Sequence, residues 1–264
     1  MPRFEEIDWY DTPLYYDLVF DVGTDEEADF LEAAHARWAL PAGRGRRVLE
    51  PACGSGRLVV ELARRGWRVQ GSDLSRPMLD HAAERLAGAG LEAKLSVQDM
   101  SDLRLGAARF DLAHCLVSTF KYLLDEKAAE AHLRGVAEAL RPGGIYVLGF
   151  HLTDYEDDRR NRERWVVERG RTRVVCNIQG WPPDRKRRRE AVRSRLVVHE
   201  GERELRSETS WEFRTYDAAQ VRRLLRRVPE LEHVATRDFN YRIDEELDLD
   251  GEHLDVVLVL RRRA

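Results

Sequence analysis

The chain has 264 residues, of which 35% are charged and 43% hydrophobic, and its formal net charge is -4 at pH 7. This length suits one large α/β domain, or one domain with a sizeable insertion, and does not require a second independent domain. A slightly negative chain has no overall positive field that would attract nucleic acid. The chain has no run of 18 apolar residues and begins with the acidic, aromatic stretch MPRFEEIDWYDTP, so we expect neither a membrane span nor a secretion signal.

The three cysteines are Cys53, Cys115 and Cys176, which lie far apart in the chain and do not have the spacing of metal ligands. We interpret them as reduced thiols of a cytoplasmic protein, and we expect no metal site.

Residues 1–44 are expected to form an N-terminal helical or lid segment. IDWYDTPLYYDLVFD is dense in Trp, Tyr and Asp, and DEEADFLEAAHARWAL has the pattern of a helix. Such a segment can simply pack on the edge of a sheet. It can also cover a ligand, since aromatic side chains with a polar tip suit a partly wet surface.

Residues 45–151 alternate short apolar runs with helical periodicity and are expected to form a cofactor-binding core. The pattern predicts strands at 46–50, 67–72, 92–97, 110–116 and 144–150, and helices near 56–65, 76–87 and 126–140. This alternation favours a parallel sheet with helices on both faces. In LRPGGIYVLGF, the residues Pro142, Gly143 and Gly144 should end the third helix and turn the chain.

Residues 152–215 change to a period near two, which predicts about three antiparallel strands with one wet face. We interpret them as an inserted antiparallel β layer that forms a substrate roof or a dimer contact. Residues 216–264 should complete the core sheet, with a helix that begins after the N-cap Asp217 and β runs at 231–239 and 254–261.

The bend RVLEPACGSGRLVVELARRG leaves a strand at Glu50 and turns through Gly54 and Gly56, which lets the main chain approach a ligand closely. A dinucleotide fingerprint would need a third glycine where Val59 stands. A P-loop would need Lys where Arg57 stands. The carboxylate of Glu50 suits a cationic ligand group and would repel a pyrophosphate.

Two more acids follow the next two predicted strands. Asp73 offers two acceptor oxygens to the two hydroxyls of a ribose. Asp99 could accept a hydrogen bond from an adenine amino group, with Leu74 or Met100 on the ring. Together these carboxylates fit S-adenosylmethionine, with Glu50 for its cationic tail, Asp73 for its ribose and Asp99 for its adenine.

With these motifs the sequence resembles the class I S-adenosylmethionine-dependent methyltransferases. The resemblance lies in VLEPACGSGRLVVELARRGWRVQGSDLSRPMLDHAAERL, VQDMSDL, FDLAHCLVSTFKYLL and LRPGGIYVLGF, which follow one another in family order. It implies an α/β fold with a doubly wound, Rossmann-like, seven-stranded and mostly parallel sheet whose last strand is antiparallel, and S-adenosyl-L-methionine as the cofactor. The first motif opens with Glu50 rather than the commoner Asp.

The resemblance also implies site residues. The cofactor-binding set is Tyr16, Glu50, Ala52, Gly54, Gly56, Arg57, Asp73, Leu74, Met78, Asp99, Met100, Leu116 and Val117. Candidate substrate residues are Tyr10, Ser118, Phe120, Trp165, Trp181 and Arg214. Candidate catalytic residues are His151 and His114, near the carboxyl ends of their strands, and Tyr16, because an N-terminal tyrosine closes over the cofactor in related enzymes.

These features predict a methyltransferase that acts by SN2 transfer on an amine or hydroxyl of a small molecule. The tetrapeptide Asn/Asp-Pro-Pro-Tyr/Phe is absent after the fourth strand, which disfavours nucleic-acid bases as acceptors. The arginine runs at 184–190 and 222–227 keep an RNA methyltransferase open as an alternative. A non-catalytic cofactor-binding module and a homodimer through the β insertion also stay open.

Overall fold

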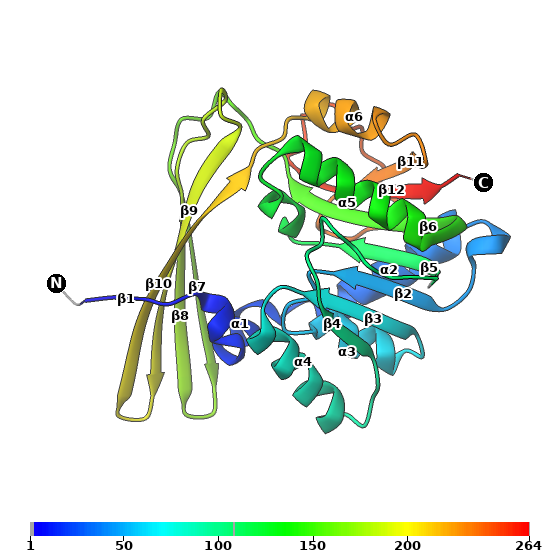
Figure 1. The fold of residues 1–264 in the computed structure, drawn as a ribbon. Helices are drawn as coiled ribbons and strands as arrows, with labels where there is room; N and C mark the ends of the chain where they lie inside the picture. Colours follow the sequence, from blue (N-terminus) through cyan, green and yellow to red (C-terminus); the bar gives the residue numbers. More distant parts are fainter. Residues whose placement is uncertain (1–2, 108, 264) are drawn as a thin grey trace.

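The computed structural model describes residues 3–107 and 109–263, whose strands form two sheets (Figure 1). The larger sheet has seven strands in the order β11-β12-β6-β5-β2-β3-β4. In chain order these are β2 (Arg47–Pro51), β3 (Arg68–Asp73), β4 (Lys94–Val97), β5 (Phe110–Cys115), β6 (Leu140–His151), β11 (Leu231–Arg237) and β12 (Asp255–Arg262).

The seven-stranded sheet is parallel from β4 across to β6, and β12 runs antiparallel to both β6 and β11. One face packs against α2 (Thr24–Trp38), α3 (Arg57–Arg64) and α4 (Arg76–Gly88). The other face packs against α5 (Glu126–Ala139) and α6 (Ala218–Arg226). The predicted doubly wound, mostly parallel fold with an antiparallel last strand is therefore confirmed.

The predicted start of β6 was four residues too late. The strand begins at Leu140, which pairs with Phe110, and a bulge follows before Ile145 resumes the ladder. Gly143, with φ +80°, lies in this bulge, so the Pro-Gly-Gly stretch bends the strand instead of preceding it. The helix before it ends at Ala139, close to the predicted position.

The inserted layer contains four long strands rather than the predicted three. They are β7 (Asn161–Arg169), β8 (Thr172–Gly180), β9 (Arg189–Glu200) and β10 (Arg203–Arg214), and the short β1 (Glu5–Glu6) adds to β10 in parallel. The additional strand arises because Gly170, with φ +60°, reverses the chain between β7 and β8.

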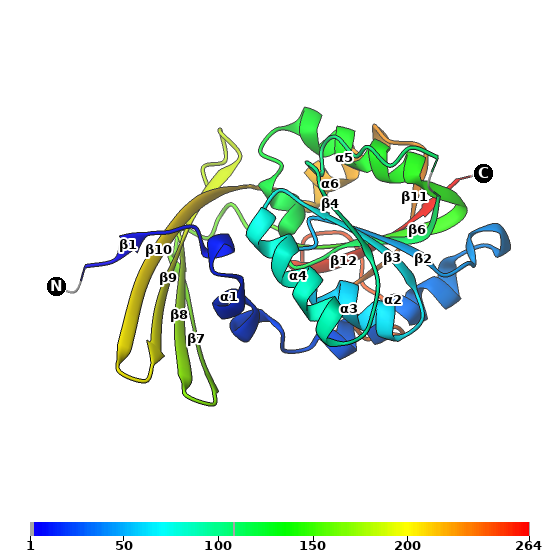
Figure 2. The same cartoon turned by 60° about the horizontal axis from the view of Figure 1, so that its bottom comes forward.

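The inserted sheet stands beside the larger sheet, with α1 (Pro13–Phe20) between them in both ribbon views (Figures 1 and 2). The chain leaves the core after β6 and returns at α6, and these two points are joined where Thr153 N donates to Tyr216 O at 2.8 Å. A second joint lies at the start of α5, where Glu126 Oε2 accepts from Arg188 Nη1 at 2.7 Å and Arg214 Nη2 at 2.8 Å. In the part of the chain that the structure describes, no helix is long and apolar enough to cross a membrane.

Candidate functional site

The glycine bend after β2 is built from left-handed backbone. Ala52, Gly54 and Gly56 have φ values of +54°, +52° and +73°. A Cβ on Gly56 would lie 2.6 Å from Ala82 Cβ, so glycine there lets α3 lie close to α4. A Cβ on Gly54 would meet nothing within 4 Å, so the bend faces open space at that position.

Asp73 ties this bend to the end of β3. Its Oδ2 accepts from Gly54 N at 2.8 Å, and its Oδ1 accepts from Ser75 N at 2.8 Å. Burial raises the pKa of Asp73, while these backbone hydrogen bonds act to lower it. Each oxygen keeps a lone pair, which suits two neighbouring hydroxyl donors. Leu74, the next residue, is 66% exposed, which fits a flat apolar group lying on it.

Glu50, at the end of β2, is buried beside His114 of β5. Its Oε2 has no hydrogen-bond partner among the described residues, and neither ring nitrogen of His114 has one. His114 Nδ1 lies 3.9 Å from Glu50 Oε1. Burial raises the pKa of Glu50 to about 8, although Arg57 acts to lower it, and burial lowers the pKa of His114 to about 3. Buried polar atoms without partners are rare, so an ammonium donor would complete this cluster.

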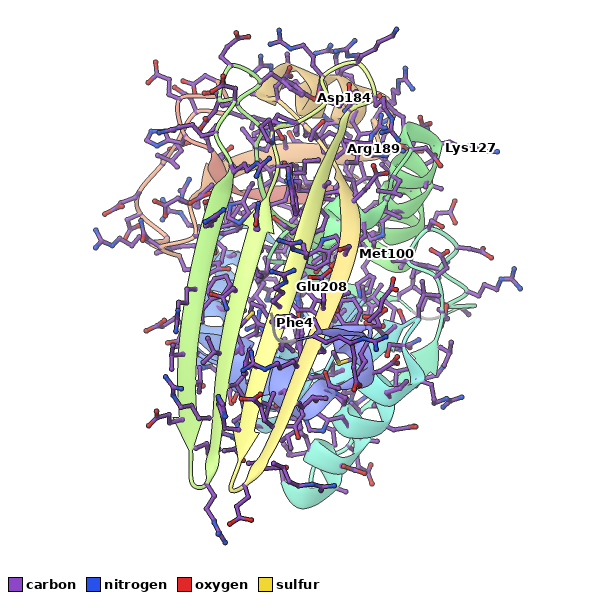
Figure 3. All side chains as sticks on the ribbon, turned by 90° about the vertical axis from the view of Figure 1, so that its left-hand side faces the viewer. Phe4, Met100, Lys127, Asp184, Arg189 and Glu208 are labelled. Atoms are coloured by element: carbon purple, nitrogen blue, oxygen red, sulfur yellow. The ribbon has the colours of Figure 1, made fainter. Side chains whose placement is uncertain are left out.

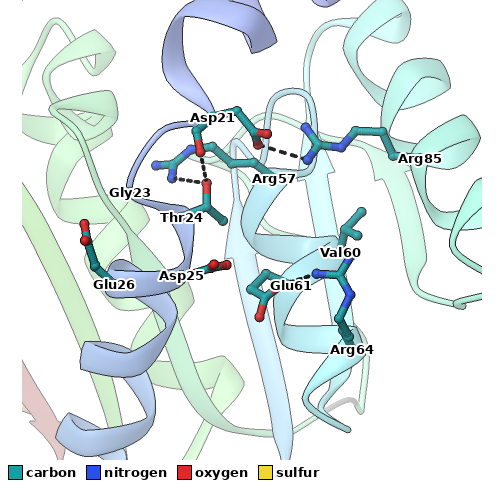
Figure 4. Close-up of a pocket in the computed structure, with 10 residues that line it drawn as sticks. All are labelled: Asp21, Gly23, Thr24, Asp25, Glu26, Arg57, Val60, Glu61, Arg64 and Arg85. Carbon is teal, nitrogen blue, oxygen red and sulfur yellow. Dashed lines mark hydrogen bonds and ion pairs between the residues drawn. The ribbon is translucent and has the colours of Figure 1, made fainter.

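Arg57, in the first turn of α3, neutralises part of this acidic cluster. It forms an ion pair with Glu27 of α2 at 2.5 Å and donates from Nη1 to Thr24 Oγ1 at 3.2 Å. On its other side Arg57 lines a polar cavity of about 330 Å³ between the starts of α2 and α3 (Figure 4). Glu27 was not predicted as a site residue, because its helix holds several other acids and periodicity does not distinguish them.

Three tyrosines lie near Asp73. Tyr10, in the short helix η1 (Trp9–Asp11), donates to Tyr122 Oη at 2.8 Å, and Tyr122 ends the short helix η3 (Thr119–Tyr122) that follows β5. Tyr16 of α1 is half-buried, and loss of solvent raises its pKa to about 12, with the charge of Asp73 also raising it. All three phenols are therefore neutral at physiological pH.

The N-terminal segment is held across the end of β3. Ser75 Oγ donates to Tyr10 O at 3.4 Å, and Trp9 N donates to Thr209 Oγ1 of β10 at 3.0 Å. The segment thus bridges the two sheets where Asp73 lies, which is the position expected of a cover.

The turn after β5 is strained. Val117 and Ser118 both have positive φ, +54° and +64°, and a β-branched residue rarely adopts this conformation. Val117 is 47% exposed, whereas Leu116 is buried in the core. Ser118 Oγ accepts from His151 N at 3.2 Å, which joins the ends of β5 and β6.

The two candidate histidines have different surroundings. His151 is half exposed, its Nδ1 lies 2.5 Å from Asp255 Oδ1, and its ring packs edge-on against Phe239. His114 is fully enclosed. The ring of His151 is therefore open to solvent, whereas the ring of His114 is not.

Several predicted cofactor residues have structural roles. Met78 and Met100 are buried in helix and loop packing. Asp99 Oδ1 already accepts from Ser101 N and Ser101 Oγ, each at 2.7 Å, although its side chain is exposed.

The structure does not bring four predicted substrate residues into the crevice by Asp73. Phe120 is buried against Phe150 and Tyr216 in the core. Arg214 is paired with Glu126, and Trp165 packs on Phe20 of α1. Trp181 lies beneath Arg193, whose guanidinium is 5.2 Å from the ring centroid. The alternating pattern of the inserted strands does not show which of their faces turns inward, so the sequence could not place Trp181 beside Arg193.

Sequence reasoning missed an aromatic wall beside Tyr10. Tyr122 packs on Phe213 and Trp211 of β10, with ring centroids 4.8 and 6.4 Å apart, and Trp211 packs on Trp9 at 4.7 Å. The only available signal was the aromatic content of η1 and β10, which does not distinguish a pocket wall from core.

The part of the chain that contains the glycine bend after β2 is similar to known proteins. A family model described as a methyltransferase domain matches residues 48–144. An N,N-dimethyltransferase of dTDP-3-amino-3,4,6-trideoxy-alpha-D-glucopyranose from Streptomyces venezuelae is 34% identical over 101 residues, which are 38% of this chain and 40% of that protein. The chain spans about half the length of the curated relatives that it matches.

Solved structures resemble the chain over nearly its whole length. An S-adenosylmethionine-dependent methyltransferase from Clostridium acetobutylicum has a TM-score of 0.77 at 20% identity and covers 97% of this chain and 99% of its own. A sugar N-methyltransferase from Streptoalloteichus has a TM-score of 0.74 at 19% identity and covers 100% and 97%. At these identities the likeness establishes the fold.

Proposed function

We propose that the chain transfers a methyl group from S-adenosylmethionine to an amine of a small molecule, because residues 48–144 match a methyltransferase-domain model and the fold is that of S-adenosylmethionine-dependent methyltransferases. A hydroxyl is the other acceptor that the sequence predicts. The observation that carries the proposal is the cradle between β2 and β3, where Asp73 accepts from Gly54 N and Ser75 N and keeps a lone pair on each carboxylate oxygen for a further donor.

The cradle fits the parts of this cofactor. Asp73 would accept from the ribose hydroxyls, and Glu50 would accept from the ammonium of the methionine part. The exposed side chain of Leu74 would lie on the adenine, and the space beside Gly54 would hold the chain between the sulfur and the ammonium. S-adenosylmethionine supplies a methyl group that its sulfonium has already activated.

The protein's part in the transfer is to position the acceptor and to exclude water. Tyr10 and Tyr122 would accept from the N–H groups of an amine and so direct its lone pair. The faces of Trp211 and Phe213 would favour a cationic or weakly polar group over bulk water. His151, oriented by Asp255, would take up the proton that an incoming ammonium must lose.

An amine is favoured over a hydroxyl by the aromatic wall and by the names of relatives. The Streptomyces venezuelae relative is named for N,N-dimethylation, and the Streptoalloteichus structure is named for sugar N-methylation. We further propose that the inserted sheet forms one wall of the acceptor pocket through Trp211, and that the protein acts in the cytoplasm.

The test incubates the purified full chain with S-adenosylmethionine and a panel of amino sugars, each paired with its hydroxyl counterpart. Mass spectrometry should detect S-adenosylhomocysteine and a methylated amine. The Tyr122→Phe variant should lower kcat/KM for the amine about tenfold while leaving the affinity for S-adenosylhomocysteine unchanged. Methylation of hydroxyls alone would overturn the choice of acceptor, and cofactor binding without turnover of any partner would favour the non-catalytic module.

A further inference from the structure

A basic groove lies on the outer face of the five-stranded sheet, away from α1 and the cofactor crevice. It has a volume of about 770 Å³, which is within the usual size of a small-molecule site. Figure 3 views the molecule from this side, with Phe4 and Glu208 labelled. The residues that form its floor and walls include Arg162, Arg164, Asn177, Gln179, Arg193 and Arg195.

The strand register arranges these six side chains in two rows. In one row Arg162 of β7 pairs with Gln179 of β8, which pairs with Arg193 of β9. In the next row Arg164 pairs with Asn177, which pairs with Arg195. Strands lie about 4.8 Å apart, and residues i and i+2 about 6.8 Å apart. The four arginines therefore start from the corners of a rectangle of about 10 by 7 Å, with the two amides between them.

Two of the four guanidinium groups are held in place. Arg193 lies over the Trp181 ring at 5.2 Å and donates to Gln179 Oε1 at 3.1 Å. Arg195 lies over the Phe4 ring at 4.8 Å and is paired with Glu208 at 2.5 Å. Such stacking fixes a guanidinium before a ligand arrives.

The other two guanidinium groups, on Arg162 and Arg164, have no ion-pair partner within residues 3–107 and 109–263. Glu208 is the carboxylate that these two rows contain. The residues that line the groove also include Arg173, Arg206 and the carboxylate of Glu163. Guanidinium groups therefore outnumber carboxylates there even when Glu208 is counted, on a chain whose net charge is negative.

We propose that this groove binds the diphosphate group of a small molecule. The fork of each arginine matches a pair of phosphate oxygens, and the amide groups of Asn177 and Gln179 can donate to oxygens at the centre. A diphosphate carries a negative charge comparable to the excess positive charge of the four corners, and it is short enough to lie among them.

This groove is distinct from the cofactor crevice. Trp165 and Cys176, which alternate with the groove residues along β7 and β8, pack on the other face of the sheet toward α1. Diphosphate should therefore bind with equal affinity in the presence and absence of S-adenosylhomocysteine, and this inference does not depend on the acceptor proposed above.

Calorimetry of the full chain with inorganic diphosphate, ADP and inorganic phosphate tests the proposal. We expect diphosphate and ADP to bind, and orthophosphate to bind at least tenfold more weakly. The double variant Arg162→Glu/Arg164→Glu should weaken diphosphate binding at least tenfold and leave the affinity for S-adenosylhomocysteine unchanged. The control Arg223→Glu/Arg226→Glu makes the same change of charge on the exposed face of α6 and should bind diphosphate as the unaltered chain does.

Four results would overturn this assignment. In the first, neither diphosphate nor ADP binds to the unaltered chain. In the second, the control Arg223→Glu/Arg226→Glu loses as much affinity for diphosphate as Arg162→Glu/Arg164→Glu does. A dimer that forms without diphosphate and dissociates in Arg162→Glu/Arg164→Glu, measured by light scattering, would assign the face to a second copy of the chain. Binding of a long polyanion such as heparin, without binding of diphosphate, would assign it to a macromolecule.

Discussion

Asp73 holds the main chain of the glycine bend and of the turn after β3, because its two oxygens accept from Gly54 N and Ser75 N. We propose above that it also holds the cofactor. The Asp73→Asn variant keeps the size of the side chain but removes its charge and one acceptor. We expect it to weaken binding of S-adenosylhomocysteine about tenfold to a hundredfold, since a hydrogen bond to a charged group contributes about 1.5–3 kcal/mol.

Titration calorimetry measures this loss, with Asp99→Asn as the matched control. Asp99 makes the same kind of turn with Ser101, but its side chain is exposed. Equal losses in the two variants would show that Asp73 has no special role in binding.

Glu50 gives the ligand-free protein a pH dependence. Its folded pKa of about 8 lies above the usual glutamate value of 4.5, because burial and the charges of Glu27 and Asp73 outweigh the charge of Arg57, while His114 beside it stays neutral. The stability that Glu50 contributes is thus fully present below about pH 4.5, and it is lost as pH rises through about 8.

The Glu50→Gln variant should therefore have a higher Tm than the unaltered ligand-free chain at pH 8, and the gap should shrink toward pH 5. Thermal denaturation at intervals from pH 5 to 9 measures it. A gap that does not change with pH would mean that Glu50 is ionised throughout.

At the residue scale, the sequence indicated Glu50 and Asp73 because each ends a strand, and the carboxyl ends of parallel strands share one edge. It did not indicate Glu27 or Tyr122, since each reaches the site from a helix whose position depends on tertiary packing. Their roles became visible only through the ion pair with Arg57 and the hydrogen bond with Tyr10.

The two glycines of the bend after β2 have different roles, since Gly56 allows close packing of α3 on α4 and Gly54 faces open space. In Gly56→Ala, the new methyl would overlap Ala82 and the backbone would be strained, so we expect a loss of about 1–3 kcal/mol of stability. In Gly54→Ala, the methyl meets no protein atom, so the loss should be limited to about 1 kcal/mol from the positive φ.

Their effects on binding should run in the opposite order. Gly54→Ala places its methyl in the space proposed for the cofactor and should weaken S-adenosylhomocysteine binding more than Gly56→Ala does. Urea denaturation and calorimetry on both variants measure the two quantities. Parallel changes in both would mean that the bend does not face the cofactor.

At the scale of elements, the strands and helices of residues 45–151 lie close to their predicted positions, because hydrophobic periodicity is a local signal. The same holds for α6, whose start was predicted from the N-cap residue Asp217. The start of β6 and the hairpin at Gly170 were missed. A bulge and a tight turn depend on the partner strand, and the sequence of one strand does not contain that information.

The two sheets are joined by a charged contact at Glu126. Its carboxylate accepts from Arg188 and Arg214, and Arg214 is nearly enclosed, so removing the acid leaves buried positive charge without a partner. We expect Glu126→Gln to lower the free energy of unfolding by about 1–3 kcal/mol.

The control is Glu130→Gln, whose partner Arg134 is about 40% exposed and whose loss should cost under about 1 kcal/mol. Chemical denaturation measures both variants. An equal loss would mean that the contact between the sheets adds little beyond a surface ion pair.

For the whole molecule, the sequence predicted that an antiparallel layer is inserted after β6, but not which of its faces turns inward. Arg193 and Trp211 lie on opposite faces although both are on strands of alternating pattern. Which face turns inward depends on how α1 and the N-terminal aromatic side chains pack between the two sheets. These contacts join residues that are far apart in the chain.

The joint between Thr153 and Tyr216 has an evolutionary consequence. Since the inserted sheet leaves and rejoins the core at two neighbouring points, residues 154–215 form a cassette whose exchange leaves the pairing of β6 with β12 intact. Gene recombination at this joint would give the proposed cofactor site a new wall of the proposed acceptor pocket in one step. A laboratory chimaera cut at the same two residues should keep its affinity for S-adenosylhomocysteine while changing the amine that it accepts.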